Sequence, residues 1–264
     1  MKFVIDWLNG RAKGYTTKTG TEEVRATSWS TGKVGMIGTS YEGTLPLAAA
    51  TTGVAGLEVV VPVSPNTSYY NYYRANGLVR SPGGYLGEDV DVLYDFVASG
   101  DTAGRANCDK IWKIGIFAGA KGQDRATSDY NDFWASRDLV PLAKNIKAAV
   151  LLAHGLNDYN VMPSHSVRVF EELQANKIPS AIYLHQGGHG GNPPDDMLNR
   201  WFSHYLYGVD NGVEKDAKAW VVSNLATAPA PAPGSRPAPA PAAPFANFPV
   251  PGSTPVQQIG RAHV

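Results

Sequence analysis

Apolar runs and amphipathic segments alternate along most of the chain. Short apolar runs, typical of buried parallel strands, cover residues 34–37, 57–63, 148–153 and 180–185. Amphipathic patterns predict helices over residues 89–99, 166–175 and 195–207. The Ala-rich stretch at residues 47–50 predicts a further helix soon after the first run. Strands that alternate with helices predict an α/β protein with a mostly parallel sheet.

The sequence GTSYEG at residues 38–43 joins the first apolar run to the Ala-rich stretch. A strand that turns sharply at a serine and leaves as a helix is the pattern of a nucleophile elbow. The glycines at both ends of the motif let the backbone crowd this turn, so we expect the Ser40 hydroxyl to project above the sheet. The backbone amide of Tyr41 would then point at an oxyanion. Serine alone is a weak nucleophile, so this interpretation requires a histidine base and an acid.

Two downstream loops supply candidates for the acid and the base. Asp158 follows the run at residues 148–153, in the loop HGLNDYNV. His189 follows the run at residues 180–185, in the loop GGHGG. Functional groups of open α/β sheets gather in loops beyond the carboxyl ends of the strands. The chain order Ser40, Asp158, His189 is that of an α/β-hydrolase.

Each of these residues also has a plain structural explanation. A G-x-S-x-G match is a weak signal, and here the second glycine comes one residue late. An Asp after a strand is commonly a helix cap or turn former, and a His among glycines is commonly only a loop residue. Three such residues at three strand ends, in the required order, favour the catalytic interpretation.

Several segments resemble the X-prolyl dipeptidyl aminopeptidases, which are serine peptidases. The similar segments are residues 4–10, 38–43, 71–77, 81–89 and 154–161, and the resemblance runs from about residue 3 to about residue 220. Together with the chain order of the candidate triad, it implies an α/β-hydrolase fold with flanking helices. The aromatic-containing stretch at residues 104–141 predicts a helical cap insertion, at about residues 80–141. The resemblance also implies release of Xaa-Pro dipeptides from free N-termini. The late glycine is shared with related cocaine-esterase-like acyl hydrolases, whereas residues 71–89 resemble the aminopeptidase branch more specifically.

The resemblance implies substrate-binding residues in addition to the triad. Tyr69, Tyr72 and Val161 fall at positions that form the proline pocket. Glu88 and Asn160 fall at positions that bind the substrate's α-ammonium group. Core and cap packing is the alternative explanation for the tyrosines. For Glu88 the alternative is an acidic residue at a helix N-terminus, where the helix dipole favours negative charge.

Both ends of the chain are expected to be truncated. Few residues precede the elbow, and Tyr15 does not match the upstream tyrosine whose hydroxyl completes the family's oxyanion hole. We expect residues 1–226 to form a partial catalytic domain and the Pro/Ala-rich residues 227–264 to form a disordered tail. The family instead continues into a jelly-roll β domain. The final residues 258–264 match the translation of a sequencing adapter and are expected to be non-native.

Composition excludes several classes of function. Lys+Arg and Asp+Glu both number 23, so there is no net basic charge to attract nucleic acid. No apolar stretch reaches the roughly 18 residues of a membrane span, and no histidine spacing or glycine motif implies a metal or cofactor. The single cysteine, Cys108, excludes an internal disulfide.

Sequence leaves the wider setting of the protein open. The start lacks a signal peptide's long apolar region, which favours the cytoplasm, but an internal start would leave secretion open. A homodimer of a full-length parent also stays open. Peptides with a penultimate proline are the expected substrates. The alternatives are a related esterase or amide hydrolase with the same triad, and an inactive truncated fragment.

Overall fold

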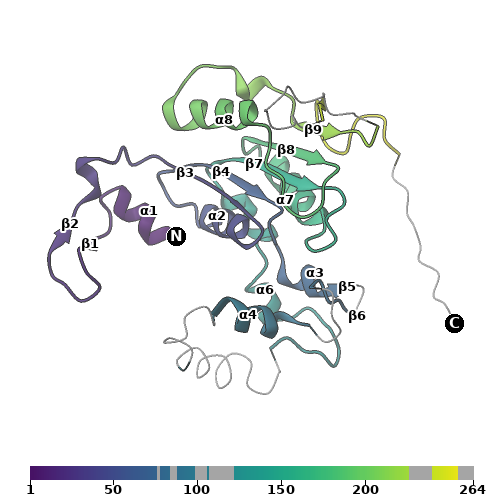
Figure 1. Ribbon diagram of the computed structural model, residues 1–264, viewed down its shortest axis with the longest axis horizontal. Helices are drawn as coiled ribbons and strands as arrows, with labels where there is room; N and C mark the ends of the chain where they lie inside the picture. The colour runs from purple at the N-terminus through teal and green to yellow at the C-terminus, as the bar shows by residue number, and fades with distance from the viewer. Residues whose placement is uncertain (76–77, 84–87, 99–105, 107–121, 226–239, 255–264) are drawn as a thin grey trace, which may run out of the picture.

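The computed structural model describes residues 1–75, 78–83, 88–98, 106, 122–225 and 240–254. Its centre is a six-stranded sheet with the strand order β10-β9-β8-β7-β4-β3 (Figure 1). Neighbouring strands from β3 to β9 are parallel, and β10 is antiparallel to β9. The strands are β3 (Val34–Thr39), β4 (Leu57–Val63), β7 (Ala149–Gly155), β8 (Ser180–His185), β9 (Ala219–Val222) and β10 (Ala242–Phe245).

Helices cover both faces of the sheet. Helices α2 (Tyr41–Thr51) and α7 (Ser164–Ala175) pack on one face, and α8 (Asp195–Tyr207) packs on the other. Successive side chains along each strand point to opposite faces of the sheet, so the core around the sheet forms two clusters, one on each face. Val60 belongs to the cluster under α2 and α7, whereas its neighbour Val59 belongs to the cluster under α8. Burial on both faces is why the strands are continuous apolar runs in the sequence.

Smaller elements form an N-terminal arm and a second lobe (Figure 1). The arm holds α1 (Lys2–Leu8), β1 (Gly14–Tyr15), β2 (Glu23–Val24) and a 3₁₀ turn (Ala26–Ser28). The second lobe holds α3 (Tyr69–Tyr73), β5 (Arg74–Ala75), β6 (Leu78–Val79), α4 (Val90–Ala98) and α6 (Asp132–Ala135). Further 3₁₀ turns lie at Val140–Asn145 and Val213–Lys215.

The expected cap insertion coincides in part with this second lobe. Residues 84–87, 99–105 and 107–121 of that insertion, Cys108 among them, lie outside the described residues. The division of the chain into domains therefore stays a prediction. Within the described part of the chain, each helix is too short or too polar to cross a membrane.

The expectation of a disordered tail from residue 227 is wrong for β10. This strand pairs along its whole length with β9, and Lys218 donates its backbone N–H to the Phe245 carbonyl at 3.1 Å. Phe245 also packs against the core. Proline is tolerated here because β10 is an edge strand, where a missing N–H costs no ladder hydrogen bond if it faces outward. Residues 226–239 and 255–264, including the adapter-like end, lie outside the described residues.

Candidate active site

The elbow residue Ser40 joins β3 to α2 in a conformation that L-residues rarely adopt, with φ 61° and ψ −124°. Its backbone N–H donates to the Val63 carbonyl of β4 at 2.8 Å. A Cβ at position 38 would overlap the Glu42 carbonyl, and one at position 43 would lie 2.7 Å from the Gly38 oxygen. Only glycine fits at both positions, as the elbow motif predicts. Tyr41 begins α2, so its N–H has no acceptor within the helix.

The candidate acid and base contact each other. His189 Nδ1 lies 2.7 Å from Oδ2 of Asp158. The other carboxylate oxygen accepts the backbone N–H groups of Asn160 and Val161, each at 3.0 Å. Burial acts to raise the pKa of Asp158, but hydrogen bonds from His154 and His189 outweigh it and lower the pKa to about 2. Asp158 is therefore ionised at neutral pH and can orient the His189 ring.

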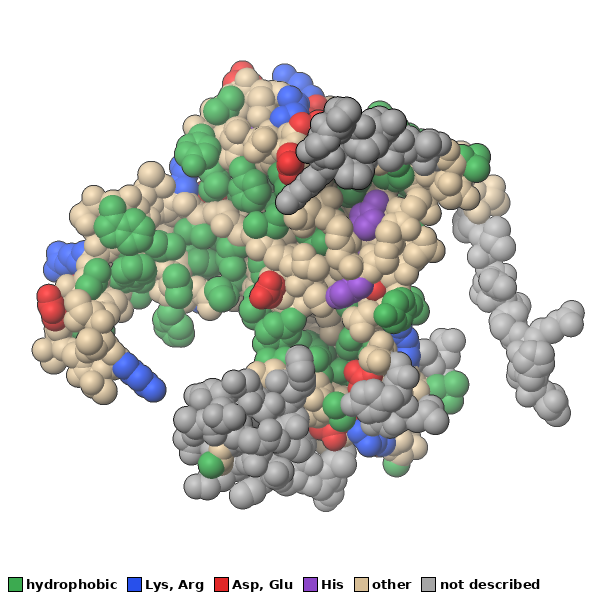
Figure 2. Space-filling model, in the orientation of Figure 1, with side chains coloured by type: hydrophobic (Ala, Val, Ile, Leu, Met, Phe, Trp, Pro, Cys, Tyr) green, Lys and Arg blue, Asp and Glu red, His purple; other side chains and the backbone are tan. Residues whose placement is uncertain are grey.

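The loop that carries His189 packs over the strand ends beside the elbow. The Gly190 amide donates to the Ser64 hydroxyl at 3.1 Å, directly after β4. A Cβ built on Gly190 would lie 3.6 Å from Thr39 Cγ2, one residue before Ser40. Ser40 and His189, both described residues, are not hydrogen-bonded to each other; in ligand-free enzymes this contact often forms only with substrate. Histidine side chains are exposed on this face, where the sheet body meets the second lobe (Figure 2).

The residues expected to bind the substrate amine both contact one short segment, the adjacent residues Pro82 and Gly83. Asn160 donates its side-chain amide to the Pro82 carbonyl at 3.2 Å and accepts the Tyr72 hydroxyl at 3.2 Å. The next residue, Gly83, donates its backbone N–H to the Glu88 carboxylate. A Cβ on Gly83 would overlap that carboxylate. Asn160 therefore binds Pro82 and Glu88 binds Gly83, so the two side chains contact consecutive residues of one turn.

The residues expected to form the proline pocket share one aromatic cluster. Tyr72 and Val161 are buried in it, and Tyr69 packs against them. Burial raises the pKa of Tyr69 to about 12, so its phenol stays protonated. A pocket of about 380 Å³ opens beside the elbow; its lining residues are Tyr41, Tyr69, Val90, Leu93, Tyr94, Val97 and Arg137. Most of this lining is apolar or aromatic.

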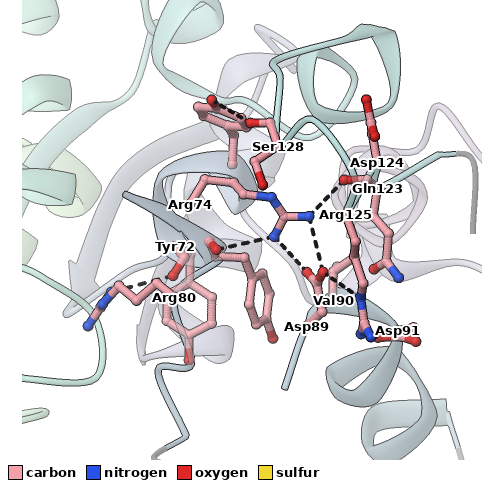
Figure 3. A network of polar contacts seen from close by, with 12 residues as sticks. Tyr72, Arg74, Arg80, Asp89, Val90, Asp91, Gln123, Asp124, Arg125 and Ser128 are labelled. Carbon is pink, nitrogen blue, oxygen red and sulfur yellow. Dashed lines mark hydrogen bonds and ion pairs between the residues drawn. The ribbon is translucent and has the colours of Figure 1, made fainter. Parts of the chain in front are cut away.

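A buried ion-pair network begins at Asp89, the residue after Glu88, and no sequence motif predicts it. Arg74 and Asp89, whose side chains are 0% exposed, form paired contacts of 3.0 Å. Figure 3 shows the Arg74 guanidinium between the Asp89 carboxylate and the Gln123 carbonyl, which it reaches at 2.7 Å. Arg125 reaches the same carboxylate at 3.1 Å. Because these residues lie far apart along the chain, no local pattern could have revealed the network.

A second arginine, Arg80, fastens the acid loop to the second lobe. Its Nη2 donates to the Tyr159 carbonyl at 2.6 Å and contacts the Asn160 carbonyl at 3.3 Å. Its Nη1 donates to the Tyr72 carbonyl at 3.4 Å (Figure 3). Among the described residues, no group of three His, Cys, Asp or Glu side chains is arranged to hold a metal ion.

A parallel sheet, a strained serine between strand and helix, and an Asp–His contact on later loops define an α/β-hydrolase. Solved structures share this fold. An aminopeptidase from a marine sediment Thaumarchaeota archaeon is 16% identical with a TM-score of 0.56, over 94% of this chain and 42% of its own. A CocE/NonD family hydrolase from Staphylococcus aureus is 16% identical with a TM-score of 0.53, over 85% of this chain and 36% of its own. At this identity the likeness shows the fold alone.

The family model for X-Pro dipeptidyl-peptidase (S15 family) matches residues 1–191. The chain belongs to this family, which confirms the resemblance noted from the sequence. A putative Xaa-Pro dipeptidyl-peptidase of Rhodopirellula baltica is 57% identical over 254 residues. An Xaa-Pro dipeptidyl-peptidase of Ligilactobacillus salivarius is 41% identical over 222 residues. These matches cover 96% and 81% of this chain, which spans 40% and 28% of the length of the two relatives.

Proposed function

We propose that the chain carries the catalytic site of a serine hydrolase that releases Xaa-Pro dipeptides from peptide N-termini. The observation that carries this proposal is the 2.7 Å contact between Asp158 and His189, on a loop that packs beside Ser40. Family membership supports the reaction class. The geometry around Glu88 and Asn160 supports recognition of a free N-terminus.

The proposed chemistry follows from the donors and acceptors of the site. His189 Nδ1 is committed to Asp158, which leaves Nε2 to accept the proton of the Ser40 hydroxyl. The serine oxygen attacks the carbonyl carbon of the substrate's proline residue, and the Tyr41 amide stabilises the oxyanion. His189 then protonates the leaving amine, so that an acyl-enzyme forms. Water activated by the same imidazole hydrolyses this ester and regenerates the serine.

Substrate recognition would use the second lobe. The Glu88 carboxylate and the Asn160 side-chain oxygen would accept hydrogen bonds from the substrate's α-ammonium group. Glu88 is 7% exposed, so its charge is poorly screened by water. The proline ring would enter the pocket lined by Tyr69, beside the aromatic cluster in which Tyr72 and Val161 are buried. A rigid ring loses little conformational entropy when it binds in such a pocket.

The first test replaces the nucleophile. Ser40→Ala should lower turnover of Gly-Pro-p-nitroanilide by about 10⁴-fold or more while leaving the fold intact. His189→Ala should have a similar effect, and the double variant should be scarcely worse than either single one. The R. baltica relative serves as a positive control for the substrate. Additive losses would argue against a concerted triad, and an inactive chain beside an active relative would favour the inactive-fragment alternative.

The second test separates a dipeptidyl-peptidase from an esterase. Glu88→Gln keeps the size of the side chain but removes its charge. A hydrogen bond to a charged group contributes about 1.5–3 kcal/mol, so kcat/KM for free N-termini should fall about 10- to 150-fold. N-acetylated Gly-Pro-p-nitroanilide and p-nitrophenyl acetate are matched controls, because they offer no ammonium group. An unchanged ratio of free to blocked substrate would favour the esterase alternative.

A further inference from the structure

A second histidine contacts the carboxylate of Asp158. His154 lies in β7, and its side chain is 0% exposed. Its Nε2 lies 3.3 Å from Oδ2 of Asp158 and 2.8 Å from the Val161 carbonyl oxygen. Its Nδ1 lies 2.7 Å from Oγ of Ser166 in α7. The proposed mechanism uses neither His154 nor Ser166.

The contacts of His154 determine its tautomer. A carbonyl oxygen can only accept, so Nε2 must carry a proton to satisfy Val161. The same nitrogen lies 3.3 Å from Oδ2 of Asp158, which makes the carboxylate a second, more distant acceptor of this proton. The Ser166 hydroxyl can then donate to Nδ1, because a hydroxyl rotates to suit its partner. The opposite tautomer would aim a nitrogen lone pair at two oxygen atoms in a site without solvent access, which is strongly unfavourable.

The Asp158 carboxylate thus has four donor groups around it. Oδ1 accepts the backbone N–H groups of Asn160 and Val161, and Oδ2 lies against both histidines. Only His189 among these donors sits on a separate glycine-rich loop; the others belong to β7 and the acid turn itself. The donors from β7 and the acid turn therefore fix the orientation of the carboxylate that His189 contacts.

We propose that His154 is a positioning residue for the triad, whose Nε2–H holds Oδ2 of Asp158 in the orientation that His189 requires. The inference rests on the proposed function, since it assigns Asp158 as the acid. In this arrangement Ser166 fixes the tautomer of His154, His154 fixes the carboxylate, and the carboxylate fixes the ring of His189. Without the Nε2–H of His154, the Asp158 carboxylate could rotate, and the His189 ring would spend less time aligned with Ser40.

The first measurement needs no variant. ¹⁵N spectra of the chain labelled at histidine should show His154 protonated at Nε2 and unprotonated at Nδ1. Ser166→Ala should weaken this preference, because it removes the partner of Nδ1. A proton on Nδ1 alone in the wild-type chain would overturn the proposal.

The second measurement follows the His189 Nδ1 proton, which gives a low-field ¹H signal while it is held by Asp158. His154→Leu should speed its exchange with water at least 10-fold. His154→Gln should largely restore protection, because its amide nitrogen stands the same number of bonds from Cβ as Nε2. The matched control is His165→Leu: His165 is also buried, but it hydrogen-bonds Thr67 rather than Asp158. Equal exchange in the His154→Leu and His165→Leu variants would overturn the proposal.

Kinetics provide the third measurement. Because a misaligned base slows the chemical step, His154→Leu should lower kcat about 10- to 150-fold with little change in KM, the size expected for one hydrogen bond to a charged group. His154→Gln should recover most of that loss. The outcomes separate the two proposals: activity that survives Ser40→Ala would refute the serine mechanism without touching the proton measurements, whereas unchanged exchange in His154→Leu would refute only the role of His154.

Discussion

The strain at Ser40 should be measurable as a stability difference between two inactive variants. A non-glycine residue in a sparsely populated backbone region costs about 1–3 kcal/mol. Ser40→Ala keeps this strain and Ser40→Gly removes it, while both delete the nucleophile. The backbone contacts of the elbow, from the N–H groups of Gly43 and Thr44 to the Ser40 carbonyl, remain in both variants.

The expected magnitude follows from two opposing terms. Glycine loses more backbone entropy on folding than alanine, which costs about 0.5–1 kcal/mol. The relief of strain exceeds this cost, so Ser40→Gly should be more stable than Ser40→Ala by about 1 kcal/mol. Such a sign is unusual, because glycine normally destabilises a folded chain relative to alanine.

The assay is urea unfolding of the variants, with a matched pair in a regular helix. Ser203 lies inside α8, where Ser203→Gly should be less stable than Ser203→Ala by about 1 kcal/mol. The two sites should therefore give opposite signs, about 2 kcal/mol apart. If the glycine variant is less stable than the alanine variant at both sites, the Ser40 backbone is not strained and this prediction is wrong.

The site contacts predict three further outcomes. The folded-state pKa of Asp158 lies below its ordinary 3.8, so the stability contributed by its ionised form is present above that pH and is lost as pH falls toward 2. In urea unfolding, this contribution to the free energy of unfolding should fall by about 1 kcal/mol by pH 3 and by about 2 kcal/mol by pH 2. The Asp158→Asn variant should lack this part of the pH dependence. Gly83→Ala should displace the Glu88 carboxylate and lower the free-to-blocked substrate ratio in the same direction as Glu88→Gln; an unchanged ratio would contradict this contact. Asp89→Ala should lower the free energy of unfolding by about 3–5 kcal/mol, because it leaves Arg74 buried without its main partner. The double variant Arg74→Met with Asp89→Leu should lose less stability than Asp89→Ala. A double variant that is less stable than Asp89→Ala would argue against a coupled ion pair.

The parts of the fold that sequence predicts well are those with long, unambiguous apolar patterns. The bounds of β4, β8 and α8 agree with the predicted ranges at residues 57–63, 180–185 and 195–207. Helix α7 begins two residues earlier than predicted, since periodicity marks the buried face better than the helix end. Each of these elements is buried against the sheet, so its sequence directly records its environment.

Elements that depend on distant partners could not be predicted in this way. β10 has a proline-rich sequence, and it forms because β9 offers an unpaired edge. The paired contacts of Arg74 and Asp89 join residues that are 15 positions apart, beyond any helical or strand period. His154 gave no recognisable signal, because its role depends on Ser166, 12 positions away in the following helix. Such contacts are specified by tertiary packing rather than by local sequence.

The acid turn at residues 158–161 serves both halves of the proposed site. Asp158 faces His189, Asn160 faces the Tyr72 hydroxyl, and Val161 contributes its amide to the carboxylate and its side chain to the aromatic cluster. Arg80 holds the backbone of this turn against the second lobe. A substrate amine that binds at Asn160 therefore acts on the same few residues that orient the base. For this reason, substitutions within the turn should change kcat and KM together, and only side chains outside it, such as Glu88 and His154, can separate recognition from catalysis.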